Sequence, residues 1–248
     1  MTAIILFFIG HWFLSLMYHT VFLHRYSSHA MFTMSRFWER VFFVFTWLAQ
    51  GSSFLIPRAY AIMHRRHHQY SDTDKDPHSP YNYSNVISMM IATYREYNYI
   101  KNHRVPEDFD TGGYPRPPEW PRFEKIAGNP AVRIVFILAY AGFYIAFAPS
   151  PWWFLLIPIH VLMGPIHGAI VNWCGHKYGY INYTETGDRS RNTLPVDILM
   201  MGELFQNNHH RTPDKAGFAH KFYEFDPTYI VVRLLSAIKI IHLPQTAR

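Results

Sequence analysis

Four short histidine clusters in this 248-residue chain could hold metal ions, because neutral imidazole is the commonest metal ligand in proteins. The clusters read HRYSSH, HRRHH, NWCGH and QNNHH, and they contain His24, His29, His64, His67, His68, Asn172, His176, Gln206, His209 and His210. In the second cluster the histidines have i, i+3, i+4 spacing, so on a helix they share one face and can converge on one point. The fourth cluster repeats this spacing, and Asn172 and His176 in the third are four residues apart.

The first cluster fits a shared metal less simply. His24 and His29 are five residues apart, which is about 140° around an ideal α-helix. They can therefore share one metal only if the helix ends or bends between them. Asp72, Asp74 and Asp76 follow the second cluster and could orient imidazole N–H groups from behind. Each cluster alone also fits a charged surface loop, and it is their combination beside apolar segments that predicts a metal site.

The composition restricts the kind of metal centre. Cys174 is the only cysteine in the sequence, so an intramolecular disulfide and a thiolate zinc site are excluded. Eight imidazoles exceed the coordination of one ion, so the clusters predict two metal ions. Histidine-rich ligation suits iron, zinc or copper, and with open positions it suits dioxygen activation by iron.

Basic residues are absent from long apolar segments and frequent between them, which is typical of a membrane protein. Residues 1–23 contain no lysine or arginine, 24–130 contain thirteen, 131–170 contain one and 171–248 contain nine. The net charge of +6 is therefore explained by basic segments between membrane spans, and we expect no nucleic-acid partner.

Three apolar segments are long enough to span a bilayer, which needs about 20 residues. They are residues 3–23, 131–148 and 151–171, and the proline-rich break between the last two predicts a helical hairpin with a kinked second arm. Residues 41–57 are interrupted by polar side chains and suit an interfacial or re-entrant segment. A soluble helix is expected at about 85–101.

Three spans with the N-terminus outside would place all four clusters at one face, and the positive-inside rule makes that face cytoplasmic. The expected fold is an all-α integral membrane protein with about three transmembrane helices and an interfacial helix. A helical cytosolic cap would hold the histidine-rich di-metal site. We expect a single domain over residues 1–248, with cytosolic segments at 24–130 and 172–248 around the hairpin 131–171. The N-terminus lacks the features of a cleaved secretory signal and is expected to be retained.

The clusters HRYSSH, HRRHH followed by DTDKDPH, NWCGH, and GELFQNNHH resemble those of the integral-membrane fatty acid desaturases. The resemblance is to the acyl-CoA (stearoyl-type) group and its bacterial relatives, and it covers the chain from about residue 20 to 230. It implies that the eight clustered histidines bind two iron ions and that Asn172 reaches one of them through water. It gives no catalytic residue beyond these metal ligands.

The resemblance also implies an activity and its partners. A long-chain acyl group, expected as acyl-CoA with Δ9-type attack, would receive a cis double bond, with O2 as co-substrate. The electrons would come from a separate ferredoxin-like or haem carrier and its reductase. Membrane lipids surround the protein, which is expected in a bacterial inner membrane with its active site facing the cytoplasm.

Three features depart from that pattern. Gln206 stands where acyl-CoA desaturases have histidine, so its role as a ligand is open. There is room for only one span before HRYSSH, and the segment after DPHSP differs from that of the animal enzymes.

Two other functions remain compatible with the sequence. One is a related membrane di-iron hydroxylase or ketolase of a lipid, and the other is a membrane metal-binding or transport protein. The histidines lie mostly outside the apolar segments, which disfavours transport. The sequence leaves open whether the acyl group is carried on CoA, a lipid or a carrier protein, which carbon is attacked, the electron donor and the oligomeric state.

Overall fold

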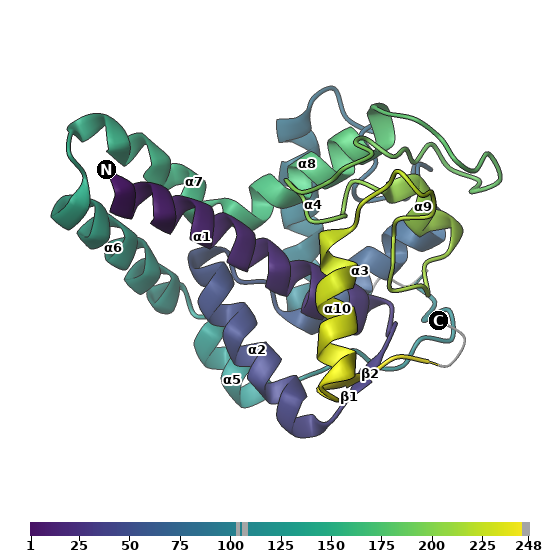
Figure 1. The fold of residues 1–248 in the computed structure, drawn as a ribbon, viewed down its shortest axis with the longest axis horizontal. Helices are drawn as coiled ribbons and strands as arrows, with labels where there is room; N and C mark the ends of the chain where they lie inside the picture. The colour runs from purple at the N-terminus through teal and green to yellow at the C-terminus, as the bar shows by residue number, and fades with distance from the viewer. Residues whose placement is uncertain (103–104, 106–108, 245–248) are drawn as a thin grey trace.

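The computed structural model describes residues 1–102, 105 and 109–244, and these form a mostly helical protein (Figure 1). Its α-helices are α1 (Thr2–Tyr18), α2 (Arg36–Gln50), α3 (Pro57–Tyr70), α4 (Val86–Lys101), α5 (Pro121–Ala127), α6 (Pro130–Phe147), α7 (Ile157–Val161), α8 (Met163–Lys177), α9 (Gln206–Arg211) and α10 (Pro227–Ala237). A π-helix (His19–Ser28) continues α1, and short 3₁₀ turns occupy Gly51–Ser53 and Pro151–Leu156. Two two-residue strands, β1 (Thr33–Met34) and β2 (Ile241–His242), pair antiparallel.

The apolar segments form helices that are candidate membrane spans, as the sequence predicts in outline. Within the described residues two helices are long and apolar enough to cross a membrane, Thr2–Ser28 and Pro130–Phe147. Pro151–Val161 and Met163–Lys177 together would make a third span, but they bend by 67° at Leu162. The predicted kink in the second hairpin arm is therefore confirmed, while the number of spans stays a prediction. In Figure 1 the N-terminus and the α6–α7 connection lie together at one end of the molecule.

The first predicted span does not end before HRYSSH. The helix continues to Ser28, because its backbone changes from α to π geometry, in which the N–H of one residue bonds the carbonyl five residues earlier. The hydroxyls of Ser27 and Ser28 reinforce this register by donating to the carbonyls of Phe22 and Leu23, at 2.7 and 2.9 Å. The first histidine cluster therefore lies at the buried end of a long helix.

The segment predicted as interfacial, residues 41–57, is divided between α2 and a turn. α2 begins at the Ser35 cap, whose side chain accepts from Trp38 N, and it is amphipathic. Its buried face packs beside α1. The chain leaves α2 at Gly51, whose φ of +53° and close approach to the Tyr140 hydroxyl of α6 leave no room for a side chain.

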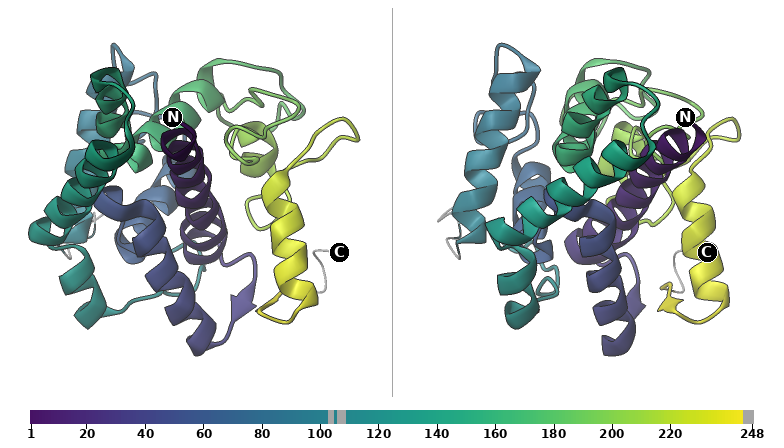
Figure 2. Two further views of the ribbon diagram at one scale, coloured as in Figure 1. Left: turned by 60° about the vertical axis from the view of Figure 1, so that its left-hand side comes forward. Right: turned by 90° about the vertical axis from the view of Figure 1, so that its left-hand side faces the viewer.

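The remaining helices surround the end of the long first helix. α3 packs on the π-helix and on α4, and α8 contacts both α4 and α9. α4 begins at an Asn85 capping box and ends at Lys101, which confirms the helix predicted at 85–101. In the right view of Figure 2, α4 and α10 lie on opposite sides of the molecule, with α1 and α2 between them. The main apolar core is centred where the π-helix, α2 and α3 meet.

Candidate metal centre

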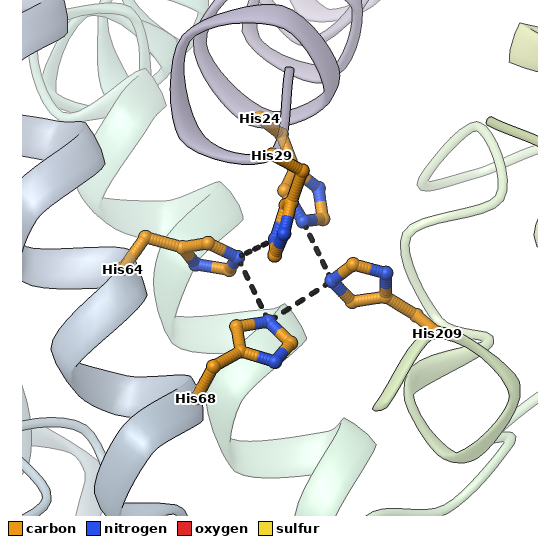
Figure 3. A group of neighbouring side chains, drawn as sticks. All are labelled: His24, His29, His64, His68 and His209. Carbon is orange, nitrogen blue, oxygen red and sulfur yellow. Dashed lines mark hydrogen bonds between the residues drawn. The ribbon is translucent and has the colours of Figure 1, made fainter. Parts of the chain in front are cut away.

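Five histidines from three distant segments point their rings at one another (Figure 3). The end of the first helix, α3 and α9 supply them, and they are His24, His29, His64, His68 and His209. We call these the five-histidine group. Their Nε2 atoms form a chain of close contacts: His29 to His64 at 2.8 Å, and His64 to His68 at 3.1 Å. His68 to His209 at 3.0 Å and His209 to His24 at 2.9 Å complete it.

Hydrogen bonding alone does not account for these contacts. Each neutral imidazole nitrogen either donates one hydrogen or offers one lone pair, yet the Nε2 atoms of His64, His68 and His209 each face two neighbours. At most two of the four contacts can be hydrogen bonds at once. Nitrogens bonded at about 2.1 Å to one ion, at right angles to each other, are about 3.0 Å apart. The observed 2.8–3.1 Å spacing therefore fits a shared metal ion.

The π-helix is what brings the first cluster to this group. His29 N donates to His24 O at 3.3 Å, a bond between residues five apart. In that register residues five apart lie above one another instead of about 140° apart as on an α-helix. The expected requirement that the helix end or bend between His24 and His29 is met by a change of helix type, followed by the helix end at Ser28.

A second set of three histidines, His67, His176 and His210, converges beside the first, and we call it the three-histidine group. The Nε2 atoms of all three are buried and lack a hydrogen-bond partner among the residues that the structure describes. Buried unpaired nitrogen is costly, so three such atoms converging on one point fit a metal ion that they would ligate.

Each Nδ1 in the three-histidine group faces a carboxylate. His67 Nδ1 lies 3.0 Å from both oxygens of Asp76, His176 Nδ1 lies 2.9 Å from Asp72 Oδ2, and His210 Nδ1 contacts Asp188 Oδ2. A carboxylate at Nδ1 holds the hydrogen there and leaves the Nε2 lone pair for a metal. The sequence predicts that Asp72, Asp74 and Asp76 orient imidazoles. Asp72 and Asp76 contact histidines of this group, whereas Asp74 is exposed. Asp188 carries no local signal that identifies it.

A buried ionic cluster supports the five-histidine group from behind. His24 Nδ1 lies 2.6 Å from Glu203 Oε2, and Glu203 Oε1 accepts from Arg25 Nη1 at 3.0 Å. Arg25 is fully buried, and its Nη2 donates to Asp226 at 3.0 Å. Burial raises the pKa of Glu203, but His24 and Arg25 outweigh burial and lower it to about 2. Glu203 is therefore a carboxylate at neutral pH and holds the hydrogen of His24 on Nδ1.

Burial sets the protonation of the histidines that lie outside the membrane segments. It lowers the pKa of His64, His68 and His209 well below 6.5, which keeps them neutral and able to bind a metal. Burial acts on the pKa of His67 in the same direction, but Asp76 outweighs it and raises that pKa. Burial outweighs Asp188 and lowers the pKa of His210 to about 4, so within the three-histidine group protons compete with a metal more readily at His67 than at His210.

The two non-histidine candidates lie beside the groups. Gln206 is buried and its amide donates to Glu203 O at 2.6 Å, so one end of this side chain is committed to the protein backbone. A Cβ at Gly175 would collide with Gln206, so glycine there lets α9 approach α8. Asn172 is half-buried on α8, one turn before His176. Whether either side chain ligates a metal, directly or through water, stays a prediction.

A cavity of about 510 Å³ leads to these residues between α4 and α8. Its walls are largely apolar, and the polar side chains among them include His24, His64, Asn172, Glu203 and Gln206. Cavities of this size and character bind apolar small molecules. The site therefore combines two histidine groups suited to metals with an apolar cavity that reaches the five-histidine group.

The comparisons with known proteins agree with this arrangement. The family model for fatty acid desaturases matches residues 1–232, and the chain belongs to the fatty acid desaturase family. It is 30% identical over 230 residues to an sn-1 stearoyl-lipid 9-desaturase of Synechocystis sp., covering 89% of this chain and 66% of that protein.

Two further relatives carry different substrates in their names. A hex-5-enoyl-[acyl-carrier protein] acetylenase of Moorena producens is 29% identical over 250 residues, covering 94% of this chain and 74% of the relative. A chloroplastic palmitoyl-monogalactosyldiacylglycerol delta-7 desaturase of Arabidopsis thaliana is 29% identical over 241 residues, covering 92% and 59%. The chain thus spans 59–74% of the length of these three relatives.

Proposed function

We propose that this protein is an O2-dependent fatty acyl desaturase that introduces a cis double bond into a long-chain acyl group. The observation that carries the proposal is an apolar cavity lined by two members of the five-histidine group, His24 and His64, with the three-histidine group converging beside them. The family membership and the stearoyl-lipid 9-desaturase relative support a Δ9-type position for the new bond.

We propose iron for both ions, because histidine-rich ligation suits iron and iron activates dioxygen. The five-histidine group and the three-histidine group would each hold one ion, with the eight clustered histidines as ligands. When bound, the two irons would supply the redox chemistry that removes one hydrogen from each of two adjacent methylenes and, with two electrons from a separate carrier and two protons, reduces O2 to two waters. The carboxylates at Nδ1 hold the hydrogens away from the metal-facing nitrogens.

The cavity walls would position the acyl chain. Met90 on α4 faces Gly168 on α8, where an added Cβ would lie 3.9 Å from the Met90 Cε, so the passage is narrow at this level. A straight-chain apolar substrate fits such a slot, and its walls also exclude water from the inner end. We expect Gly168→Leu to block the passage and to reduce desaturation at least tenfold without removing a histidine.

The proposed reaction leaves a choice between three molecules that could carry the acyl group, namely CoA, a lipid and an acyl-carrier protein. The resemblance of the histidine clusters favours acyl-CoA, whereas relatives are named for acyl-lipid and acyl-carrier-protein substrates. Assays of the purified protein with each of the three carriers decide between them.

The membrane setting is likewise proposed. The two long apolar helices and the distribution of basic residues support an integral membrane protein of a bacterial inner membrane, with its histidine groups facing the cytoplasm. Alkaline phosphatase and a fluorescent protein, each fused to the chain after α10, test whether this end of the protein faces the cytoplasm.

Expression in a desaturase-deficient bacterial host tests the reaction. Mass spectrometry of total fatty acids should show new monoenes with the wild type and none with His67→Ala. His242→Ala provides a matched control, because His242 is exposed on β2 and outside both groups. Hydroxylated lipids would instead support the hydroxylase or ketolase alternative. An unchanged lipid profile from a metal-loaded protein would contradict the proposed reaction and favour metal binding or transport.

A further inference from the structure

An exposed aromatic side chain is hydrogen-bonded to the main chain of one histidine of the three-histidine group. Tyr81 is 40% exposed, and its hydroxyl donates to the main-chain oxygen of His176 at 2.8 Å. The imidazole of the same residue, His176, belongs to the three-histidine group. One hydrogen bond and the bonds within a single residue thus connect the protein surface to a nitrogen that faces the metal position.

A second connection runs beside the first. The backbone N–H of Arg189, an exposed residue, donates to Asp72 Oδ2 at 2.8 Å, and the same oxygen lies 2.9 Å from His176 Nδ1. The preceding residue, Asp188, contacts His210. The loop after α8 is therefore attached to two histidines of the three-histidine group through their carboxylate partners.

Two cations flank the exposed ring. The Arg189 guanidinium carbon lies 4.2 Å from the centre of the Tyr81 ring, and the Lys177 ammonium lies 5.5 Å from it. Lys177 also lies 4.1 Å from the centre of the Trp173 ring. Tyr81, Trp173, Lys177 and Arg189 form a cation-aromatic patch. Cations grouped around an aromatic ring complement an acidic protein surface and steer its approach.

The position of the patch favours a protein partner over lipid head groups. In Figure 1 the loop after α8 extends at the end of the molecule opposite the N-terminus and the α6–α7 connection. Trp173 and Lys177 lie in the last two turns of α8, and Tyr81 and Arg189 lie in loops outside the helices. The cation-aromatic patch is therefore at the end of α8 that continues into this loop, far along the chain from the bend at Leu162.

We propose that the cation-aromatic patch is the docking surface for an acidic one-electron carrier protein, and that Tyr81 is the point where electrons pass towards the three-histidine group. This proposal rests on the proposed function, because a desaturase must be supplied with two electrons for each double bond. At each encounter the carrier's iron–sulfur or haem group loses one electron and one metal ion of the centre gains it. Two encounters supply the two electrons that one double bond requires. Lys177 and Arg189 set the affinity, and Tyr81 sets the rate of transfer.

Binding is tested with the full chain in nanodiscs of zwitterionic lipid, using an acidic plant-type [2Fe–2S] ferredoxin as the probe. The double variant Lys177→Glu and Arg189→Glu should weaken ferredoxin binding at least tenfold at low salt and flatten its dependence on ionic strength. Lys125→Glu, an exposed charge reversal on α5, should change the affinity less than twofold. Equal effects of the two substitutions, or no effect of the double variant, would overturn the proposed docking surface.

The lipid alternative is tested in the same format. If the double variant loses affinity for anionic phosphatidylglycerol vesicles and keeps its affinity for ferredoxin, the patch is a lipid-binding surface and the proposal is wrong. Because binding is measured without turnover, this result is independent of whether the protein desaturates any lipid.

The transfer step is tested by stopped-flow reduction of the iron-loaded protein. At saturating ferredoxin, where affinity no longer limits the rate, Tyr81→Leu should slow reduction at least tenfold and leave reduction by dithionite unchanged. Tyr81→Phe keeps the ring and removes the hydroxyl bond to His176, so it should give an intermediate rate. Wild-type rates of reduction in both variants would overturn the role of Tyr81. A wild-type protein that ferredoxin reduces normally but that forms no monoene would instead contradict the proposed function.

Discussion

Replacing Asp72 with asparagine should weaken metal binding by the three-histidine group while preserving its shape. Asp72 Oδ2 faces His176 Nδ1 and the Arg189 N–H, and its Oδ1 accepts from Ser79 Oγ at 2.8 Å. An asparagine oxygen can take the first two partners, and its NH2 group can donate to the Ser79 hydroxyl, so every contact is retained. Asp72 also has a φ of +59°, which asparagine tolerates.

The substitution therefore removes a negative charge and little else. Burial raises the pKa of Asp72, but its hydrogen bonds with His176, Ser79 and the Arg189 N–H outweigh burial and hold the pKa below its ordinary value. Asp72 is thus ionised at neutral pH, and its charge makes His176 a stronger ligand. Loss of such a partner lowers metal affinity roughly 10–100-fold, which corresponds to about 1.4–2.7 kcal/mol.

Competition with a chromophoric chelator measures this change. The wild type should release two ions with separate affinities, and Asp72→Asn should weaken one of them by the stated factor. Glu39→Gln is the control, because Glu39 is a buried carboxylate that contacts Tyr26 and Arg36 instead of either histidine group. Unchanged affinity for both ions in Asp72→Asn, or equal weakening of both, would refute the reasoning.

Three further predictions follow from the same contacts. On acidification from neutral pH the three-histidine group should release its metal first, because the pKa of His67 is raised whereas that of His64 lies well below 6.5. His210, with a pKa lowered to about 4, stays neutral over this range, so protonation of His67 is the step that weakens the group. Chelator trapping at each pH measures the order, and the reverse order would contradict it. Ser27→Ala with Ser28→Ala should lower the free energy of unfolding by about 1–3 kcal/mol and weaken metal binding at the five-histidine group, measured by thermal unfolding and chelator competition. Arg25→Met leaves two buried carboxylates without their counter-ion and should cost about 3–5 kcal/mol, so a wild-type melting temperature would show that the ion cluster is dispensable.

Much of the fold could be predicted because its signals are local. Apolar length, the proline-rich break and the asparagine cap at residue 85 act within one turn or one span, and they placed the hairpin, its kink and α4. The π-helix was harder to foresee, because HRYSSH read as an α-helix separates His24 from His29. The two serines that bond back five residues are the signal that favours the wider register.

In the candidate site, too, the features set by local sequence could be predicted and those set by tertiary packing could not. The i, i+3, i+4 spacing placed His64 and His68 on one face of α3, yet the third histidine of that cluster, His67, joins the other group. Spacing shows which side chains share a helix face, but tertiary packing decides which ion position each ring meets. For the same reason Glu203 was missed, since its partner His24 is 179 residues away.

Iron-edge anomalous diffraction from crystals of the iron-loaded protein tests the central claim most directly. We predict two iron peaks, one within about 2.1–2.2 Å of the converging Nε2 atoms of the five-histidine group and the other at the same distance from those of His67, His176 and His210. A single peak, or iron bound elsewhere while these nitrogens face one another, would contradict a two-metal centre.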